Sequence, residues 1–295
     1  MDIILDNSAL SLLYCKRRFQ LTVLRGLKAD ASEPLQFGSA FHKVIEYTDK
    51  GASVIESIKR VQEEILDIDL DLLMKATLYF NQRGTPRHEA IEIDGNKAIE
   101  VKFKWLYKQI ILSNGQIANI YLCGTIDRIE LDTTNDILII RDFKTAGDPT
   151  EYLAKKKLDD YMMSFQLPFY VFALFYGNIL PPKYQAYLKD RRYRVEFTFV
   201  FYNIKPEPQT KDLIRQAFPD DFIHNEVPLI INNRAIEAAN IMTFGDKSAP
   251  HDGMNVYKGC TFCPYKIACL CMGTEREEEF LARFTQEEYN PLNFR

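Results

Sequence analysis

Two short apolar segments, each with one acidic residue near its end, constrain this chain more than any other feature. Residues 124–131 read Gly-Thr-Ile-Asp-Arg-Ile-Glu-Leu, and residues 137–145 read Ile-Leu-Ile-Ile-Arg-Asp-Phe-Lys-Thr. Both are typical of strands, in which residues two apart point to the same side. Asp142 and Lys144 should therefore project together, and Asp127 can meet them if the strands pair as a hairpin.

Two carboxylates and a lysine are the groups that metal-assisted hydrolysis of a phosphodiester requires. The carboxylates of Asp127 and Asp142 can hold a hard divalent cation such as Mg2+ or Mn2+. That cation lowers the pKa of a bound water and neutralises charge that builds on the phosphate. Lys144 can orient the water or stabilise the transition state. The Asp-x-Lys tripeptide alone also fits a solvated strand end with an ion pair, so the interpretation depends on the rest of the chain.

A candidate metal ligand lies upstream, in residues 37–46. The segment predicts a helix that begins at Gly38, with Ser39 as a possible cap. His42 and Glu46 are four residues apart and share one helical face. Imidazole suits Mn2+ better than Mg2+. Glu46 either supports the site or pairs with a neighbouring lysine.

A second helical pattern follows the acidic segments, over residues 161–174. Gln166 and Tyr170 are four apart and therefore on one face. Pro168 predicts that the helix begins or bends there. The phenylalanines of this segment fit a core, but a buried Gln166 amide would need hydrogen-bond partners, which favours a functional role.

The chain has six cysteines, and three follow the pattern Cys-x2-Cys-x5-Cys at Cys260, Cys263 and Cys269. Three thiolates in one loop need one more ligand for a closed tetrahedral site, and the candidate is Cys15. Zinc would use the same four thiolates. Disulfides would need an oxidising compartment. Cys123 fits a buried free thiol, and Cys271 competes with Cys269 as the last ligand.

With these elements in this order, the chain resembles the PD-(D/E)XK nuclease superfamily. More narrowly, it resembles the RecB-like branch, which includes CRISPR-associated exonucleases with an iron–sulfur cluster and the AddB-type nuclease domain. The resemblance implies that the metal ligands are His42, Asp127, Asp142 and the backbone carbonyl of Phe143. It implies that Lys144 positions or activates the water and that Gln166 and Tyr170 hold the substrate strand.

The same resemblance bears on the cysteines, through Tyr-Cys-x-Arg-Arg-Phe near the start and Cys-x2-Cys-Pro-Tyr-x4-Cys near the end. It implies a structural [4Fe–4S] cluster, with zinc as the less favoured occupant. The implied ligands are Cys15, Cys260, Cys263 and Cys269, and the family spacing favours Cys269 over Cys271. Such a cluster would link chain ends that are distant in sequence and remove unfolded-state entropy.

The expected fold is α/β, with a mixed central sheet flanked by helices, a restriction-endonuclease-like core and a helical insertion. We expect one nuclease domain over residues 1–295, with the helical part and insertion at 38–116, the catalytic core at 117–202, and cluster-binding segments at 1–28 and 254–275. The patterns predict helices over 7–28, most of 38–112, 151–177, 208–218 and 230–243. They predict the catalytic hairpin over 117–145, and two strands over 184–202 with a turn at 189–192.

Composition limits the partners and the compartment. The net charge is −4 and the pI about 5.7, which argues against a surface coated with basic patches for duplex DNA. Basic residues gather at 16–18, 155–157 and 189–194. The chain contains no run of 18 apolar residues, so we expect no membrane helix. The start of the chain does not have the pattern of a signal peptide, so none is expected. We expect a reducing cytoplasm, or that of a host cell if the chain is phage-encoded.

These features together predict a metal-dependent DNA exonuclease that acts on single strands or DNA ends. Recombination, repair, phage replication or CRISPR adaptation would each use such an enzyme. The chain has no Walker A motif, so a helicase or integrase partner would be a separate chain. The alternative is a DNA-end-binding or assembly module that acts mainly through such a partner. A zinc-stabilised protein with no nucleic-acid role would explain the cysteines alone.

Overall fold

The structure is a computed structural model that describes residues 1–65, 68–83, 87–147, 164–245, 260 and 263–291. The chain forms two compact units. The terminal unit comprises Met1–Asp30, Phe103–Gly124 and His224–Arg295, and the central unit comprises Ala31–Lys102 and Thr125–Ile223. That the whole chain acts as one domain stays a prediction.

The sheet of the central unit is mixed, as predicted. Strand β8 (Ile137–Ala146) pairs antiparallel with β7 (Ile117–Asp132) and parallel with β9 (Tyr193–Phe201). Strand β10 (Gln209–Gln216) continues the sheet antiparallel to β9, and β3 (Glu89–Ala90) pairs with β7. The parallel pair requires a crossover, which contains α8 (Gln166–Tyr176) and α9 (Pro182–Lys189). The predicted hairpin of the two acidic strands is confirmed.

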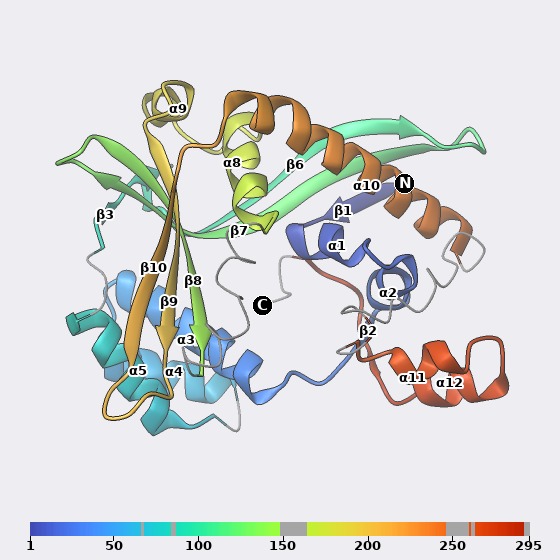
Figure 1. The fold of residues 1–295 in the computed structure, drawn as a ribbon, viewed down its shortest axis with the longest axis horizontal. Coiled ribbons are helices and arrows are strands. Elements are labelled where there is room, and N and C mark those ends of the chain that lie inside the picture. The colour runs from blue at the N-terminus through green and yellow to red at the C-terminus, as the bar shows by residue number, and fades with distance from the viewer. Residues whose placement is uncertain (66–67, 84–86, 148–163, 246–259, 261–262, 292–295) are drawn as a thin grey trace. The chain divides into compact units, whose positions relative to one another are not determined.

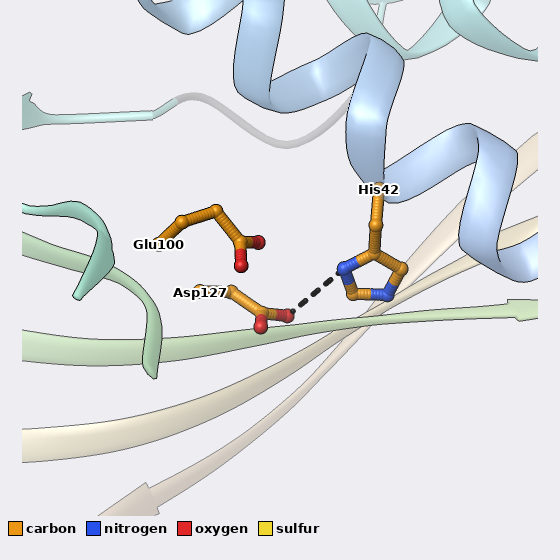
Figure 2. Close-up of side chains that lie close together, drawn as sticks. All are labelled: His42, Glu100 and Asp127. Carbon is orange, nitrogen blue, oxygen red and sulfur yellow. Dashed lines mark ion pairs between the residues drawn. The ribbon is translucent and has the colours of Figure 1, made fainter. Parts of the chain in front are cut away.

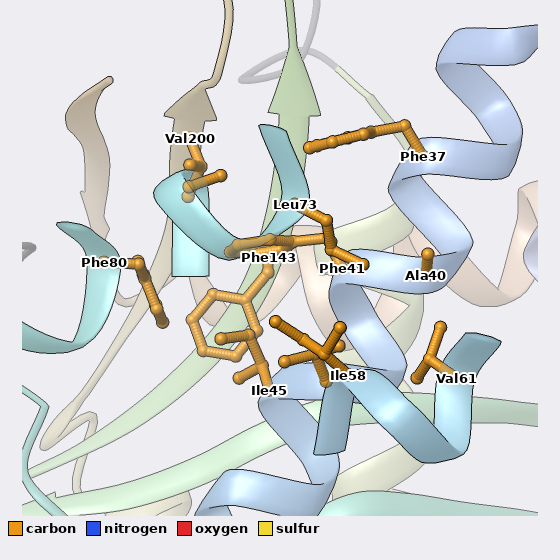
Figure 3. Packing of buried hydrophobic residues seen from close by; sticks show 12 residues of the cluster. Phe37, Ala40, Phe41, Ile45, Ile58, Val61, Leu73, Phe80, Phe143 and Val200 are labelled. Carbon is orange, nitrogen blue, oxygen red and sulfur yellow. The ribbon is translucent and has the colours of Figure 1, made fainter. Parts of the chain in front are cut away.

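Three helices cover strands β8–β10 (Figure 1). They are α3 (Glu33–Asp49), α4 (Val54–Glu64) and α5 (Leu70–Arg83). Their apolar faces form one core with Phe143 of β8 and Val200 of β9 (Figure 3). The Phe143 ring packs edge-on against Phe80, with ring centroids 5.4 Å apart. Because such buried rings fix both position and orientation, this packing attaches β8 to α3 and α5.

The helical prediction for residues 38–112 is wrong beyond Arg83. The chain there forms β3, the short hairpin of β4 (Glu92–Ile93) and β5 (Asn96–Lys97), and β6 (Ile99–Ile111). In β6, Val101, Phe103 and Trp105 alternate with exposed side chains, which is the period of a half-buried strand.

Two further predictions are wrong in part. Residues 184–202 contain one strand, β9, because Pro182 occupies the first turn of α9 and begins a helix there. Residues 208–218 form β10 rather than a helix, with exposure that largely alternates along the edge of the sheet. The helix predicted over residues 230–243 lies within α10 (Val227–Phe244) and is confirmed.

The terminal unit joins both ends of the chain. The predicted helix over 7–28 is divided into α1 (Asn7–Leu12), α2 (Lys16–Phe19), the π-helix η1 (Gln20–Leu24) and β2 (Leu27–Lys28), because Cys15 is extended and Gly26 has a φ of +64°. Strand β1 (Asp2–Leu5) pairs parallel with β7. The C-terminal part contains α11 (Lys266–Leu270), α12 (Glu275–Leu281) and β11 (Thr285–Gln286), which pairs with β2. The π-helix η2 (Phe222–Glu226) leads into α10.

A buried ionic network lies within the central sheet. Arg141 of β8 donates from Nε and Nη2 to the two carboxylate oxygens of Glu130, at 3.1 and 3.2 Å. Its Nη1 lies 2.8 Å from Glu196 and donates to the Thr198 hydroxyl at 2.7 Å. All four side chains are buried, and Arg128 and Arg194 also pair with Glu130 and Glu196, at 2.8 and 2.6 Å. The buried charges are therefore compensated by ion pairs within the sheet.

None of the helices in the described part of the chain is long and apolar enough to cross a membrane.

Candidate active site

Three side chains of the central unit form the group in the described residues best placed to hold a metal ion. One ligand atom each from His42, Glu100 and Asp127 lies within 4.8 Å of the other two. His42 Nδ1 is 3.4 Å from Asp127 Oδ2. Figure 2 shows the Glu100 carboxylate beside that of Asp127, with the imidazole reaching down from α3. One nitrogen and two carboxylate oxygens form a donor set that suits Mn2+ or Mg2+.

His42 lies near the middle of α3, so the predicted helix start is wrong. The helix begins at Glu33, with Pro34 in the first turn, where the fixed φ of proline is favourable. Gly38 is inside the helix, and a Cβ there would be 3.0 Å from the Thr145 hydroxyl oxygen. A glycine at this position therefore lets α3 approach the end of β8 closely. Ser39 donates to the Leu35 carbonyl instead of capping the helix.

Glu100 was missed by the sequence analysis. It is the second residue of β6 and has a φ of +52°, in the left-handed region that residues other than glycine rarely occupy. Such a backbone costs on the order of 1–3 kcal/mol and tends to occur at functional sites. The only signal in the sequence is an acid at the start of an alternating apolar segment, and that pattern is common on any exposed strand.

The two predicted aspartates are almost completely buried, with Asp127 2% and Asp142 1% exposed. Asp127 Oδ2 accepts a hydrogen bond of 2.8 Å from the backbone N–H of Phe143 on the neighbouring strand. The hairpin therefore fixes the Asp127 carboxylate through the residue that follows Asp142. The role predicted for the Phe143 carbonyl stays a prediction, while its side chain is part of the core.

Asp142 is held by the other predicted residues. Lys144 Nζ is 2.6 Å from Asp142 Oδ2, as the two-residue spacing predicted. Gln166 Nε2 donates to Asp142 Oδ1 at 2.8 Å and lies 2.9 Å from the hydroxyl of buried Tyr170. Among the described residues, Asp142 is not part of the group within 4.8 Å. The structure thus gives Gln166 a contact that orients an acid, which the sequence did not predict.

The structure also answers the predictions made for Pro168 and Glu46. Helix α8 begins at Gln166, so Pro168 lies in its first turn, where its missing N–H is tolerated. Glu46 pairs with Lys50 at 2.5 Å, which is the second of the two roles predicted for it.

The cysteines of the chain lie in the terminal unit. All six are free thiols, and Cys123 is completely buried. Burial raises the pKa of Cys263, and it raises that of Cys269 to about 11, with further upward contributions from neighbouring cysteines. Those neighbours include Cys15 and Cys260 in both cases. That Cys15, Cys260, Cys263 and Cys269 form one site stays a prediction.

In two of the three basic clusters, several members pair with acidic side chains. In residues 189–194, Arg192 pairs with Asp136 and Asp190, and Arg194 lies 2.6 Å from Glu196. In residues 16–18, Lys16 pairs with Glu237 at 3.5 Å. Residues 155–157 lie outside the described part of the chain.

A comparison with protein families matches residues 8–270 to the PD-(D/E)XK nuclease superfamily. Because the match covers most of the chain and the central unit has the mixed sheet with the acidic hairpin, the chain belongs to this superfamily. Its members are nucleases that use divalent metal ions to hydrolyse phosphodiesters. No match was found among curated proteins.

Proposed function

We propose that the protein is a metal-dependent DNA exonuclease of the RecB-like branch, acting on single strands or DNA ends. The observation that supports this most strongly is the convergence of His42, Glu100 and Asp127 beside the Asp142–Lys144 pair within one unit. Five elements of the central unit contribute to the site. A protein that only bound DNA would have no use for this set of buried acids.

The charges of the site favour a divalent ion. Glu100, Asp127 and Asp142 provide three carboxylates, two of them almost fully buried, and Lys144 provides one ammonium group. The excess of two negative charges would be costly in a buried site and is balanced by one divalent cation. We assign His42, Glu100 and Asp127 as ligands, with Asp142 and the Phe143 carbonyl completing the set.

The remaining residues have roles that follow from their contacts. A bound divalent cation supplies an activated water at neutral pH and offsets charge on the phosphate. Lys144 Nζ lies 2.6 Å from Asp142. From there its ammonium group would donate a hydrogen bond to that water or to a phosphate oxygen. Gln166 orients Asp142, and its helix, with Tyr170, would contact the substrate strand.

The test is digestion of end-labelled single- and double-stranded DNA with Mn2+ or Mg2+, beside a circular single strand. We expect trimming of the linear strands only, because an exonuclease needs an end. Lys144→Ala should abolish trimming, whereas Lys211→Ala, an exposed lysine on β10 of the same sheet, should leave it unchanged. Folded protein that cleaves none of these substrates would refute the proposal and favour the DNA-end-binding alternative. Cleavage of the circle would refute the exonuclease mode alone.

We further propose that Cys15, Cys260, Cys263 and Cys269 bind a [4Fe–4S] cluster. The proposal is supported by the resemblance of the segments around Cys15 and Cys260 to the iron–sulfur RecB-like nucleases. A tetrahedral zinc would use the same four thiolates, so the metal content of the purified protein distinguishes the two. Anaerobically purified protein should contain about four irons per chain, and Cys260→Ala should reduce that content while Cys271→Ala does not. Stoichiometric zinc instead of iron would refute the cluster.

The pathway also stays a prediction. Recombination, repair, phage replication and CRISPR adaptation are all compatible with this site, and a helicase or integrase would be a separate chain.

A further inference from the structure

A buried ion pair joins the two segments of the terminal unit that carry the proposed cysteine ligands. Arg17 of α2 comes two residues after Cys15 and is 4% exposed. Its guanidinium donates to the carboxylate of Glu277 on α12 and to the side chain of Gln20. Glu277 is 8% exposed. Burying two charges costs several kcal/mol per ion before their attraction is counted, so such a pair is weak evidence for stability and invites another explanation.

The pair continues to the backbone next to the C-terminal cysteines. The second carboxylate oxygen of Glu277 accepts a 2.8 Å hydrogen bond from the Gly273 N–H. Gly273 has a φ of +78° and lies in the turn that follows Cys269 and Cys271. Arg17 and Glu277 therefore connect the segment after Cys15 to the turn after Cys269. These contacts link the same two segments that a shared metal would link.

Arg17 brings a buried positive charge to within two residues of Cys15 in the sequence. Four thiolate ligands concentrate negative charge, and outer residues that compensate and orient ligands affect metal affinity strongly.

We propose that Arg17 is a positioning residue of the four-cysteine site, which holds the segment of Cys15 against the turn after Cys269 through Glu277. This inference rests on the proposed metal at these cysteines and is independent of the nuclease assignment. It implies that protein contacts assemble the two halves of the site before the metal binds. Tyr265, two residues after Cys263, supports the same arrangement because its hydroxyl donates to the Leu27 carbonyl.

The test compares metal retention in four forms of the full chain: wild type, Arg17→Gln, Glu277→Gln and Arg25→Gln. Arg25 is the matched control, since it joins the same two segments by pairing with Glu278 at 2.9 Å, but its side chain is 32% and its partner's 68% exposed. We measure iron and zinc per chain, the visible absorption spectrum, and the rate of release to a colorimetric chelator. The Arg17 and Glu277 variants should lose metal about 10- to 100-fold faster than wild type, and Arg25→Gln should not.

Every outcome of this comparison supports or overturns the role proposed for Arg17. If Arg17→Gln does not fold, Glu277→Gln provides the same comparison, because it keeps the size and hydrogen-bonding capacity of the side chain. Arg17→Lys retains the charge without the planar fork and should release metal at an intermediate rate. Release from both the Arg17→Gln and Glu277→Gln variants at the Arg25→Gln rate would overturn the role of Arg17. Wild type that holds no metal would instead overturn the metal site itself.

Discussion

Glu100 combines a proposed metal ligand with a strained backbone, so substitutions there should separate activity from stability. A left-handed residue with a Cβ costs about 1–2 kcal/mol, and Glu100 has a φ of +52°. Glycine removes that cost but loses about 0.5–1 kcal/mol through its larger unfolded-state entropy. Glu100→Gln removes the same charge and keeps the Cβ, so the difference between the two variants isolates the backbone effect. The free energy of unfolding of Glu100→Gly should therefore exceed that of Glu100→Gln by up to about 1.5 kcal/mol.

The effect on metal binding is larger. A carboxylate that binds a divalent cation directly attracts it strongly even at an effective dielectric constant of about 20. Desolvation of both ions offsets most of that attraction. Loss of an outer-shell residue typically weakens metal affinity 10- to 100-fold, or by about 1.4–2.7 kcal/mol. We expect the loss of Glu100, a direct ligand, to weaken it at least as much. Both Glu100 variants should then need correspondingly more Mn2+ for half-maximal trimming.

The assay pairs a metal titration of DNA trimming with urea unfolding in the presence of a chelator. Arg191→Gly is the control, since Arg191 has a φ of +56° in the turn before β9, and glycine there should stabilise the protein without changing metal dependence. A Glu100→Gln variant that saturates at the wild-type metal concentration would exclude Glu100 as a ligand. A Glu100→Gly variant that unfolds more easily than Glu100→Gln would show that this backbone is not strained.

Three further predictions concern the folded state. Phe143→Ala should lower the free energy of unfolding by about 3–5 kcal/mol in urea titrations, because it opens a cavity between β8 and α5, whereas Phe143→Leu should cost much less. Burial raises the pKa of Asp6 above 3.8, so the stability that this group contributes is present below that pH and is lost as the pH rises through the folded-state pKa. Asp6→Asn keeps the acceptor for the Ala9 N–H. Its melting temperature relative to wild type should therefore be higher at pH 7 than at pH 4. The same difference at both pH values would contradict this. Gly26→Ala should cost about 2 kcal/mol or more in melts, because its Cβ would lie 2.1 Å from the Glu287 carbonyl oxygen. Gly51→Ala, with open space around it, should cost less.

The sequence predicted contacts that local periodicity determines. Asp142 and Lys144 meet because alternate residues of a strand share a face, and Gln166 and Tyr170 meet because they are one helical turn apart. The hairpin followed from two apolar segments with a short connection. These contacts depend on a few neighbouring residues, so any chain with this local structure would form them.

Contacts that depend on the whole sheet could not be predicted in this way. Glu100 reaches Asp127 through tertiary structure and an unusual φ value, and neither leaves a spacing in the sequence. The residues of β10 are mostly polar, since this edge strand buries little, so their pattern was mistaken for a helix. Arg17 and Glu277 are 260 positions apart, and nothing local marks them as partners.

The buried network around Arg141 bears on how the sheet finds its register. Strand β8 begins with four aliphatic residues, and β9 consists largely of valine and phenylalanine, so apolar contacts alone would tolerate a shift of two positions. Arg141 lies opposite Glu196 in the native register and also binds Glu130 on the other neighbouring strand. A shifted pairing would bury these charges against aliphatic side chains, at a cost of several kcal/mol. Since Asp142 follows Arg141 directly, the network that rejects misaligned strands also determines which residue of β9 lies opposite this proposed metal ligand.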